Sequence, residues 1–309
     1  MLFFHALLKA FFINLIVLIV IVLIVLFPRN MEAVDVGKTI GANIEFEYGF
    51  DWTQYYVNIS TYLQTLFVEK SLGESLTGVP VSQIIHEYFP RSLTIIVTSL
   101  FLSLIFGILK GIFDFQAKFR KRSILGQGLT SFMLSIPDFF IILCLQWIII
   151  FHLPVINVFG YDHWYSFLLP SILVSIYPMM YIARITSLTI SNQESQPYTH
   201  FARAKGLTKK MVFYKHVLKN CWPTILGHVS TVMLYILSNL LIVEYLLDYK
   251  GAAYRLFKAF NYTNSISASY EAKFEAELII AIATCFMILV TLSLWFSQIV
   301  KVYVDPRRR

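Results

Sequence analysis

Charge is what this sequence has least of. Only 14% of its 309 residues are Asp, Glu, Lys or Arg, while 57% are hydrophobic. A soluble domain carries about 25% charged residues, because its surface must face water. The deficit therefore excludes an ordinary soluble domain and indicates several membrane spans rather than one large core.

Motifs for covalent chemistry and for cofactors are also absent. The sequence has no GxxxxGK[ST] phosphate loop, no HExxH and no GxSxG, and its seven histidines are scattered. Its three cysteines, Cys144, Cys221 and Cys285, lie in or beside apolar segments without CxxC spacing, as small buried hydrophobes do. We therefore predict no catalytic residue, no metal site and no cofactor in this chain. ATP, if the protein depends on it, would have to be bound by another subunit.

Six apolar segments are long enough to cross about 30 Å of hydrocarbon as helices. Their predicted limits are Ala10–Phe27, Arg91–Phe113, Gly128–Leu153, Tyr165–Ile190, Trp222–Leu247 and Glu277–Val304. The first span is followed by Leu26-Phe27-Pro28-Arg29, which has no small-residue cleavage site, so we expect it to be retained. The predicted fold is an all-α integral membrane protein with two parts: residues 1–90, a helix and an extracytoplasmic segment, and residues 91–309, a five-helix core.

The loop charges predict the orientation. Basic residues concentrate in three places: the loop 116–126, the segment 197–220 and the C-terminal Arg307-Arg308-Arg309. By contrast, residues 28–90 hold three basic residues against eight acidic ones. The positive-inside bias therefore places both termini in the cytoplasm, and an even number of spans agrees by placing both termini on one side. Because the basic residues cluster beside apolar runs, the net charge of +7 fits anionic lipid better than nucleic acid.

Several predicted spans contain residues that bend helices or let them approach closely. Gly107 and Gly111 form a small-xxx-small pair, and Pro137 and Pro178 interrupt two spans. Ordinary helix packing explains each of them, and a translocation path built from bent helices is the alternative.

Three polar residues within the spans are candidates for lining such a path: Asp138, His228 and Asn239. Asp138 can instead bond to backbone groups that the proline frees, and an interhelical hydrogen bond is the simpler role for His228 and Asn239. Glu244 lies closer to a span end, where structural pairing or snorkelling is expected.

The basic segment 197–220 interrupts the apolar pattern and has the features of two short helices. Pro197 suits the first position of a helix, and Gly206 suits the turn that ends it. Thr208 can cap a second helix that carries Val212, Phe213 and Val217 on one face. A solvated basic loop on the lipid surface is one interpretation. A docking element with exposed apolar side chains explains the composition better.

These residues, and others in the same order, resemble a known family. Phe201-Ala202-Arg203-Ala204-Lys205-Gly206-Leu207 and His216–Asn220 look like the cytoplasmic loop of ABC importer permeases of the dipeptide, oligopeptide and nickel class. Further matches follow the family's order: Leu72–Leu76, Gly78–Val81, Gly107–Gly111, Ser135-Ile136-Pro137, Leu169-Pro170, Tyr177–Arg184, Val243-Glu244 and Asp305-Pro306-Arg307. The resemblance runs from about residue 55 to the end of the chain.

The resemblance implies a type I importer permease fold and a set of partners. A second, similar permease would complete the pathway, two cytoplasmic subunits would bind ATP and Mg²⁺, and an extracytoplasmic protein would deliver the solute. It also implies that the loop is a coupling helix seated on the ATPase. The docking residues so implied are Thr199, His200, Phe201, Ala202, Arg203, Ala204, Lys205, Gly206, Leu207, Thr208, Lys209 and Lys210.

Other functions stay open at this point. A nickel or metal-chelate importer permease shares the same sequence features. An ion-driven transporter or channel that acts alone predicts several intramembrane charges and inverted repeats, whereas Asp138 is a single candidate. A sensor or assembly component built on a permease scaffold is the third alternative, because the segment after Glu244 departs from the family pattern.

Overall fold

The computed structural model describes residues 2–28, 31–35, 44–118, 124–152, 160–161, 163–260 and 274–303. Most of this part is helical. Its elements in chain order are α1 (Leu2–Val25), β1 (Met31–Asp35), β2 (Ile44–Tyr48), α2 (Trp52–Phe67), α3 (Val81–Ala117), the π-helical turn η1 (Ile124–Gly128), α4 (Leu129–Ser135), α5 (Asp138–His152), α6 (Leu168–Glu194), α7 (Pro197–Ala204), α8 (Lys209–Val212), the π-helical turn η2 (Phe213–Leu218), α9 (Lys219–Leu226), α10 (Val229–Leu246), α11 (Ala252–Ala259) and α12 (Ala276–Tyr303).

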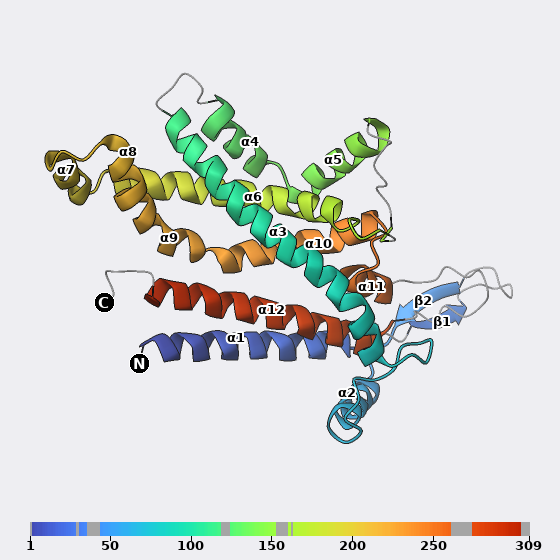
Figure 1. Cartoon of the computed structure of the whole chain (residues 1–309). Helices are drawn as coiled ribbons and strands as arrows, with labels where there is room; N and C mark the ends of the chain where they lie inside the picture. Colours follow the sequence, from blue (N-terminus) through green and yellow to red (C-terminus); the bar gives the residue numbers. More distant parts are fainter. Residues whose placement is uncertain are drawn as a thin grey trace.

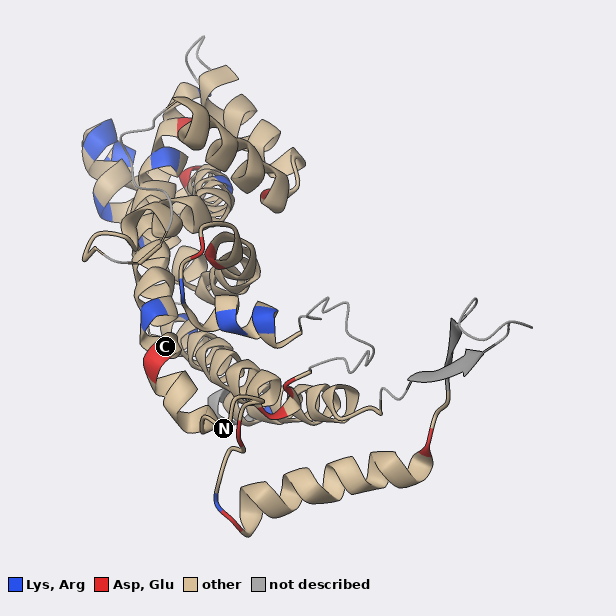
Figure 2. Cartoon of the chain, turned by 90° about the vertical axis from the view of Figure 1, so that its right-hand side faces the viewer, with Lys and Arg blue, Asp and Glu red and all other residues tan. Residues whose placement is uncertain are grey.

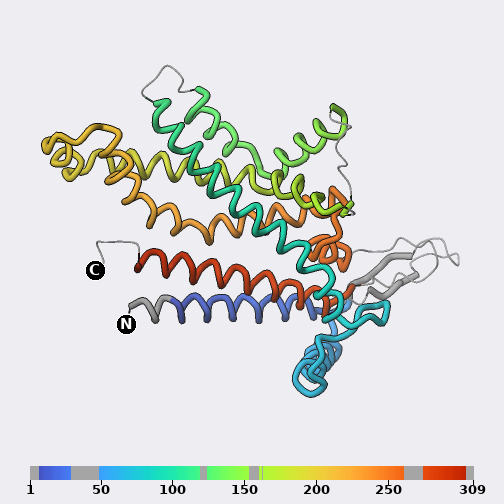
Figure 3. Tube along the Cα trace, in the orientation of Figure 1, coloured from blue at the N-terminus to red at the C-terminus, as the bar shows by residue number. Residues whose placement is uncertain are grey.

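The long helices form one bundle with two different ends. In Figure 1, α1 and α12 lie side by side, while α3, α6 and α10 form the centre. The helices α7 and α8 lie at one end, together with the start of α1 and the end of α12. The strands, α2 and α11 lie at the other end, and the tube in Figure 3 shows the same separation. The two chain ends thus share the end that carries the basic segment.

Five helices are long and apolar enough to cross a membrane, and a sixth crossing requires a broken helix pair. The five are α1, α3, α6, α10 and α12. The predicted span Gly128–Leu153 is not one helix, because η1 with α4 and the following α5 meet at a bend of 105°. Pro137 lies at this break, where its ring and missing N–H end α4 at Ser135.

Other boundaries also differ from the sequence-based expectation. The helix α3 begins at Val81 and continues through Pro90, so the predicted division at residue 90 falls inside a helix. Val81 and Ile84 are buried against α11 and α12, and this packing extends the helix. The predicted fifth span is divided at Gly227 and His228 into α9 and α10.

The part of residues 1–90 that was predicted to be extracytoplasmic is not all helical. It contains an antiparallel ribbon in which β1 pairs with β2, from Met31 opposite Tyr48 to Asp35 opposite Ile44. The arginines at 120, 122 and 307–309, which contributed to the predicted orientation, lie outside the described residues.

Small residues on α3 bring its backbone against α6. Ser99, Ser103, Gly107 and Gly111 recur every four residues, and all four are buried. Ser99 Oγ donates to the Ser171 carbonyl at 3.0 Å, and Ser103 Oγ donates to the Ser175 carbonyl at 3.3 Å. Both pairs are 72 positions apart, so the two helices run parallel in a constant register. Small residues at this spacing allow close approach in membranes, where apolar burial does not drive helix association.

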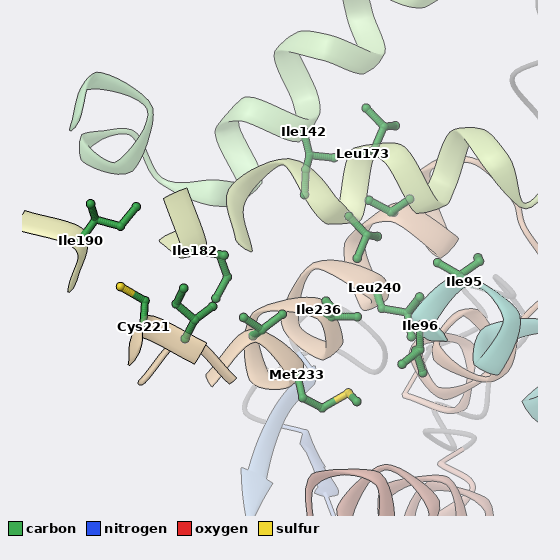
Figure 4. Close-up of a cluster of buried hydrophobic side chains, with 14 of the residues drawn as sticks. Ile95, Ile96, Ile142, Leu173, Ile182, Ile190, Cys221, Met233, Ile236 and Leu240 are labelled. Atoms are coloured by element: carbon green, nitrogen blue, oxygen red, sulfur yellow. The ribbon is translucent and has the colours of Figure 1, made fainter. Parts of the chain in front are cut away.

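The two glycines mark the closest part of this seam. A Cβ at Gly107 would lie 2.8 Å from both Ile182 Cβ and the Met179 carbonyl. At Gly111 it would lie 2.5 Å from Thr186 Cβ and 2.6 Å from the Ala183 carbonyl. The packing interpretation of this glycine pair is therefore confirmed. Beside the seam, Ile95, Ile182, Ile236 and Leu240 contribute to the main apolar cluster of α3, α6 and α10 (Figure 4).

We expect Gly111→Val to destabilise the protein, since overpacking a close contact costs about 1–3 kcal/mol. The measurement is the thermal midpoint of the purified protein in detergent. The matched control is Leu109→Val, which places the same side chain on an exposed position of the same helix. Equal midpoints for the two variants would contradict the close α3–α6 contact.

Candidate functional site

The basic segment folds as two short helices joined by a tight turn. The helix α7 begins at Pro197, as predicted, and its C-cap is Lys205. Gly206 has a φ of +82°, its N–H donates to the Arg203 carbonyl at 2.9 Å, and the Leu207 N–H donates to the Ala202 carbonyl at 3.3 Å. This pair of bonds defines a Schellman motif, in which glycine adopts the left-handed conformation without a steric cost. The turn at Gly206 is confirmed.

The second helix begins as the sequence predicts. Thr208 is the N-cap of α8, and its hydroxyl accepts from the Met211 N–H at 3.4 Å. Val212 and Val217 are buried, and Phe213 stacks on Phe115 of α3 with ring centroids 6.1 Å apart. These contacts attach the second helix to the end of α3.

The first helix is attached to the end of α6. Thr199 is fully buried, and its hydroxyl lies 2.7 Å from the Glu194 carbonyl and 2.8 Å from the Gln196 carbonyl. Arg203 Nη2 also pairs with Glu194 Oε1 at 3.0 Å. The corner between α6 and α7 is thus held by backbone and side-chain bonds together, so the pair of short helices is built as a rigid extension of α6.

The outward face of this segment is basic and partly apolar. Of the twelve predicted docking residues, nine are exposed, Leu207 is half-buried, and Thr199 and Ala202 are buried. Phe201 is 70% exposed, which is unusual for an aromatic side chain on a helix that is anchored on its other side. All six basic residues of the segment are exposed: Arg203, Lys205, Lys209, Lys210, Lys215 and Lys219. Lys209, Lys210 and Arg203 also line an open pocket of about 340 Å³ that reaches Gln116 and Glu194.

A second candidate surface lies along α6 and α10. Tyr181 and His228 form an interhelical hydrogen bond of 2.8 Å, in which the hydroxyl meets Nδ1. Tyr235 contacts the rings of both Tyr177 and Tyr181, with centroids 5.0 and 5.3 Å away. All four rings are half-buried, and Ser238 and Arg184 on the same two helices are exposed. By contrast, α1 exposes aliphatic and aromatic hydrocarbon side chains such as Ile16 and Ile24.

The three predicted pathway residues lie in different surroundings. His228 belongs to this tyrosine surface, in the role of an interhelical hydrogen-bond partner. Asp138 is half-buried at the first position of α5, directly after the break, and lies within electrostatic reach of Tyr177. Asn239 is fully buried, and within the described part of the chain its amide atoms have no hydrogen-bond partner. It therefore does not line an open surface in this conformation.

Sequence reasoning missed an ion pair at the end of α3 nearer to α7 and α8. Lys110 pairs with Asp114, which is fully buried, and the Lys110 ammonium also donates to the Gly126 carbonyl at 3.2 Å. Thr130 of α4 donates its hydroxyl proton to Asp114. The network fastens α4 to α3. A signal was present, because a Lys and an Asp four residues apart inside an apolar run imply a pair.

Glu244 forms the corner between α10, α11 and α3. The Glu244 side chain is fully buried, so it does not snorkel toward the membrane surface. Of the two roles expected for it, structural pairing is the one observed. Its carboxylate accepts from the Ser92 hydroxyl and, at 2.9 Å, from the Tyr254 N–H near the start of α11. Gly251 is required beside it, because a Cβ there would overlap the carboxylate. In the loop that follows α10, burial and then the nearby Glu244 raise the pKa of Tyr249.

The loop before α3 is held in place by two residues that lie much later in the sequence, Arg255 of α11 and Glu275, which precedes α12. The Ser75 hydroxyl donates to Glu275 at 2.6 Å, and Arg255 pairs with the other oxygen of Glu275 at 2.6 Å. Gly73 and Gly78 have φ values of +90° and +74°, so the motif Leu72–Val81 is a tight double turn. Its residues position the start of α3 and form no catalytic constellation.

Comparison with known proteins gives a consistent result. Residues 103–309 match the family described as "Binding-protein-dependent transport system inner membrane component". The chain is 25% identical over 275 residues to a dipeptide transport system permease protein, DppB, from Lactococcus lactis, covering 86% of this chain and 84% of that protein. It is 25% identical over 276 residues to the oligopeptide permease AppB of Bacillus subtilis, with coverage of 84% and 82%. It is 26% identical over 243 residues to the glutathione permease GsiC of Salmonella paratyphi A, with coverage of 76% and 79%.

We expect Asp114→Leu to destabilise the protein more than the double variant Lys110→Met with Asp114→Leu. The single change leaves a largely buried ammonium group without its partner, which costs about 3–5 kcal/mol, whereas replacing both members of a pair is often neutral. Thermal midpoints of the two variants in detergent test this. A double variant at least as unstable as the single one would show that Asp114 does not act through Lys110.

Proposed function

The chain belongs to the family of binding-protein-dependent transport system inner membrane components, and on that premise we propose that it is the permease subunit of an ATP-driven peptide importer. The observation that carries the proposal is the exposed α7–α8 pair at the end of the bundle, which presents Phe201 and the basic side chains of Arg203, Lys205, Lys209 and Lys210. The names of the relatives favour peptides as the substrate class, because they are dipeptide, oligopeptide and glutathione permeases.

The proposal includes the assembly in which the chain works. A second, similar permease forms the other half of the pathway. Two cytoplasmic subunits bind ATP with Mg²⁺ and hydrolyse it, and an extracytoplasmic binding protein supplies the peptide. This chain makes and breaks no covalent bond. The end with α7, α8 and both termini faces the cytoplasm, which the exposed basic residues of the segment support through the positive-inside bias.

The mechanism we propose for coupling uses α6 as a lever. The residues from Thr199 to Lys210 form the ATPase contact, and the Schellman turn at Gly206 holds the two short helices in one arrangement. The α6–α7 corner, with Thr199 bonded to the Glu194 carbonyl, transmits a displacement of the ATPase directly to α6. Since α3 is packed in register against α6, both helices move together. Closure of the ATPase pair therefore reaches the middle of the membrane.

The tyrosine surface of α6 and α10 is the proposed wall of the pathway. The hydroxyl groups of Tyr177, Tyr181 and Tyr235 lie within the hydrophobic spans, where a lipid-facing surface would carry aliphatic side chains, and the imidazole of His228 lies at the start of α10. Such groups hydrogen-bond to a peptide backbone whatever its sequence, which suits a permease whose binding protein sets specificity. Asp138 lies beside this wall at the break between α4 and α5.

We expect the double variant Lys209→Glu, Lys210→Glu to lose the ATPase subunits during purification while its level in the membrane stays unchanged. The physical reason is reversal of the charge on the exposed face that carries the contact. The matched control is Lys215→Glu with Lys219→Glu, an equal charge change on exposed residues outside the docking stretch. If the Lys209→Glu, Lys210→Glu variant co-purifies with as much ATPase as the control variant does, the docking assignment is wrong.

Uptake of a labelled peptide by proteoliposomes that contain the complete importer tests the transport assignment. We expect uptake to require ATP, the binding protein and this chain. Uptake that persists without any ATPase subunit indicates an ion-driven transporter that acts alone. Accumulation of nickel in place of peptide identifies the metal-importing alternative, and ATP hydrolysis without uptake of either identifies a sensor or assembly component.

A further inference from the structure

The helix α2 lies across the bundle axis rather than along it. In Figure 1 it is seen end-on beside the end of α1, away from α7 and α8. In Figure 2, which is turned by 90° so that the spans point toward the viewer, α2 runs across the view. Its axis therefore runs across the direction of the spans. No residue of α2 is buried, so its packing against the bundle is only partial.

The composition of α2 is amphipathic without charge. Its sixteen residues include no Asp, Glu, Lys or Arg, whereas Asp51, Glu69 and Lys70 flank it (Figure 2). Four large apolar side chains form one exposed strip: Trp52 at 75% exposure, Tyr56 at 74%, Leu63 at 44% and Phe67 at 70%. The polar residues Thr53, Gln54, Asn58, Thr61, Gln64 and Thr65 occupy the other side. A surface of this kind is too apolar to face water freely.

Two hydrogen bonds show how α2 is turned. Asn58 donates to the carbonyl of Leu26, just beyond the end of α1, at 3.1 Å. The Tyr55 hydroxyl donates to the carbonyl of Leu23, one turn deeper in the span, at 3.0 Å. Viewed down the axis of α2, Tyr55 lies about 60° around the helix from Asn58, because the helix has 3.6 residues per turn. A further rotation of about 60° in the same direction reaches Trp52, at the edge of the exposed strip. The strip therefore points toward the depth of the span and not away from it.

An aromatic cluster gives the depth of α2. Phe27, Phe50, Trp52 and Tyr55 contact one another, with centroid distances from 4.8 to 6.1 Å. The apolar span of α1 ends at Val25, two residues before Phe27. Aromatic side chains collect at this level because the membrane–water interface accommodates their apolar rings and polar edges.

We propose that α2 is an interfacial helix whose strip of Trp52, Tyr56, Leu63 and Phe67 lies in the lipid of the leaflet opposite α7 and α8. The strip continues the lipid-facing surface of α1, where Ile24 is 62% exposed and Phe27 is 43% exposed. Lipid fits better than a protein partner, because α2 offers no charge to orient a partner and its strip points toward the hydrocarbon. By bonding to carbonyls at the last turn of α1, α2 also supplies donors where a helix has no intrahelical partner to offer.

Site-directed spin labels on the full chain in lipid nanodiscs test this inference. With the three cysteines replaced by alanine, one label is attached at Leu63→Cys on the strip and another at Thr61→Cys on the opposite side. We expect the ratio of oxygen to water-soluble nickel-complex accessibility to be several-fold higher at position 63. Water accessibility at position 63 equal to that at 61 overturns the proposal, and so does low accessibility to both reagents, which indicates cover by protein.

A label at Ile16→Cys separates this inference from the membrane assignment on which it rests, since Ile16 is 60% exposed in the middle of α1. If the label at position 16 contacts lipid and the label at position 63 contacts water, only the interfacial-helix proposal is wrong. If the label at position 16 also contacts water, the assignment of α1 to the membrane is wrong as well. Labelling of the same cysteines in intact cells by a membrane-impermeant maleimide repeats the test without purification. Slow reaction at 63 and rapid reaction at 61 are expected, and equal rates contradict the proposal.

Discussion

The close backbone contact between α3 and α6 is the constraint on which the rest of the structure depends. A membrane offers little apolar driving force for helix association, so contact must come from shape and from hydrogen bonds to backbone groups. Ser99, Ser103, Gly107 and Gly111 supply both, at a spacing that keeps every small residue on the same face. The parallel direction of the two helices follows, and it requires the intervening chain to return through the bent pair α4 and α5. The Lys110–Asp114–Thr130 network secures that return.

The proposed docking segment, residues 197–220, and the proposed pathway wall both lie along the same pair of helices. At one end, α6 passes into α7 through the buried Thr199 corner, and α3 receives the ring of Phe213, so the docking segment is attached to both helices. In the middle, α6 shares the tyrosine surface with α10. At the other end, Ser92 of α3 bonds to Glu244, which holds the start of α11. Packed contacts therefore connect α7 and α8, through α3 and α6, with the middle of the bundle and with its other end.

Much of the docking segment was predictable, because its signals are local. Pro197, Gly206 and Thr208 act through φ restriction, a left-handed turn and a side-chain cap, each of which depends on a few neighbouring residues. The long apolar runs also predicted α6 and α12 to within about four residues, whereas α1 begins at Leu2, well before the predicted Ala10. The predicted third span is not one straight helix, since hydropathy does not distinguish a straight helix from one that is bent by 105° at Pro137. The start of α3 was placed too late, because Val81 and Ile84 are helical through contacts with residues some 170 to 200 positions away.

The sequence by itself determined the class of the protein, the helix–turn–helix at Gly206 and the small-residue face of α3, since composition and short-range stereochemistry are properties of adjacent residues. Tertiary structure alone decided which of the polar residues share a surface. It joined His228 to Tyr181 and Tyr181 to Tyr235, buried Asn239 one turn beyond Tyr235 and turned the uncharged helix α2 across the bundle. Those outcomes depend on how each helix rotates about its axis and on where its neighbours lie, and periodicity along one chain segment contains neither.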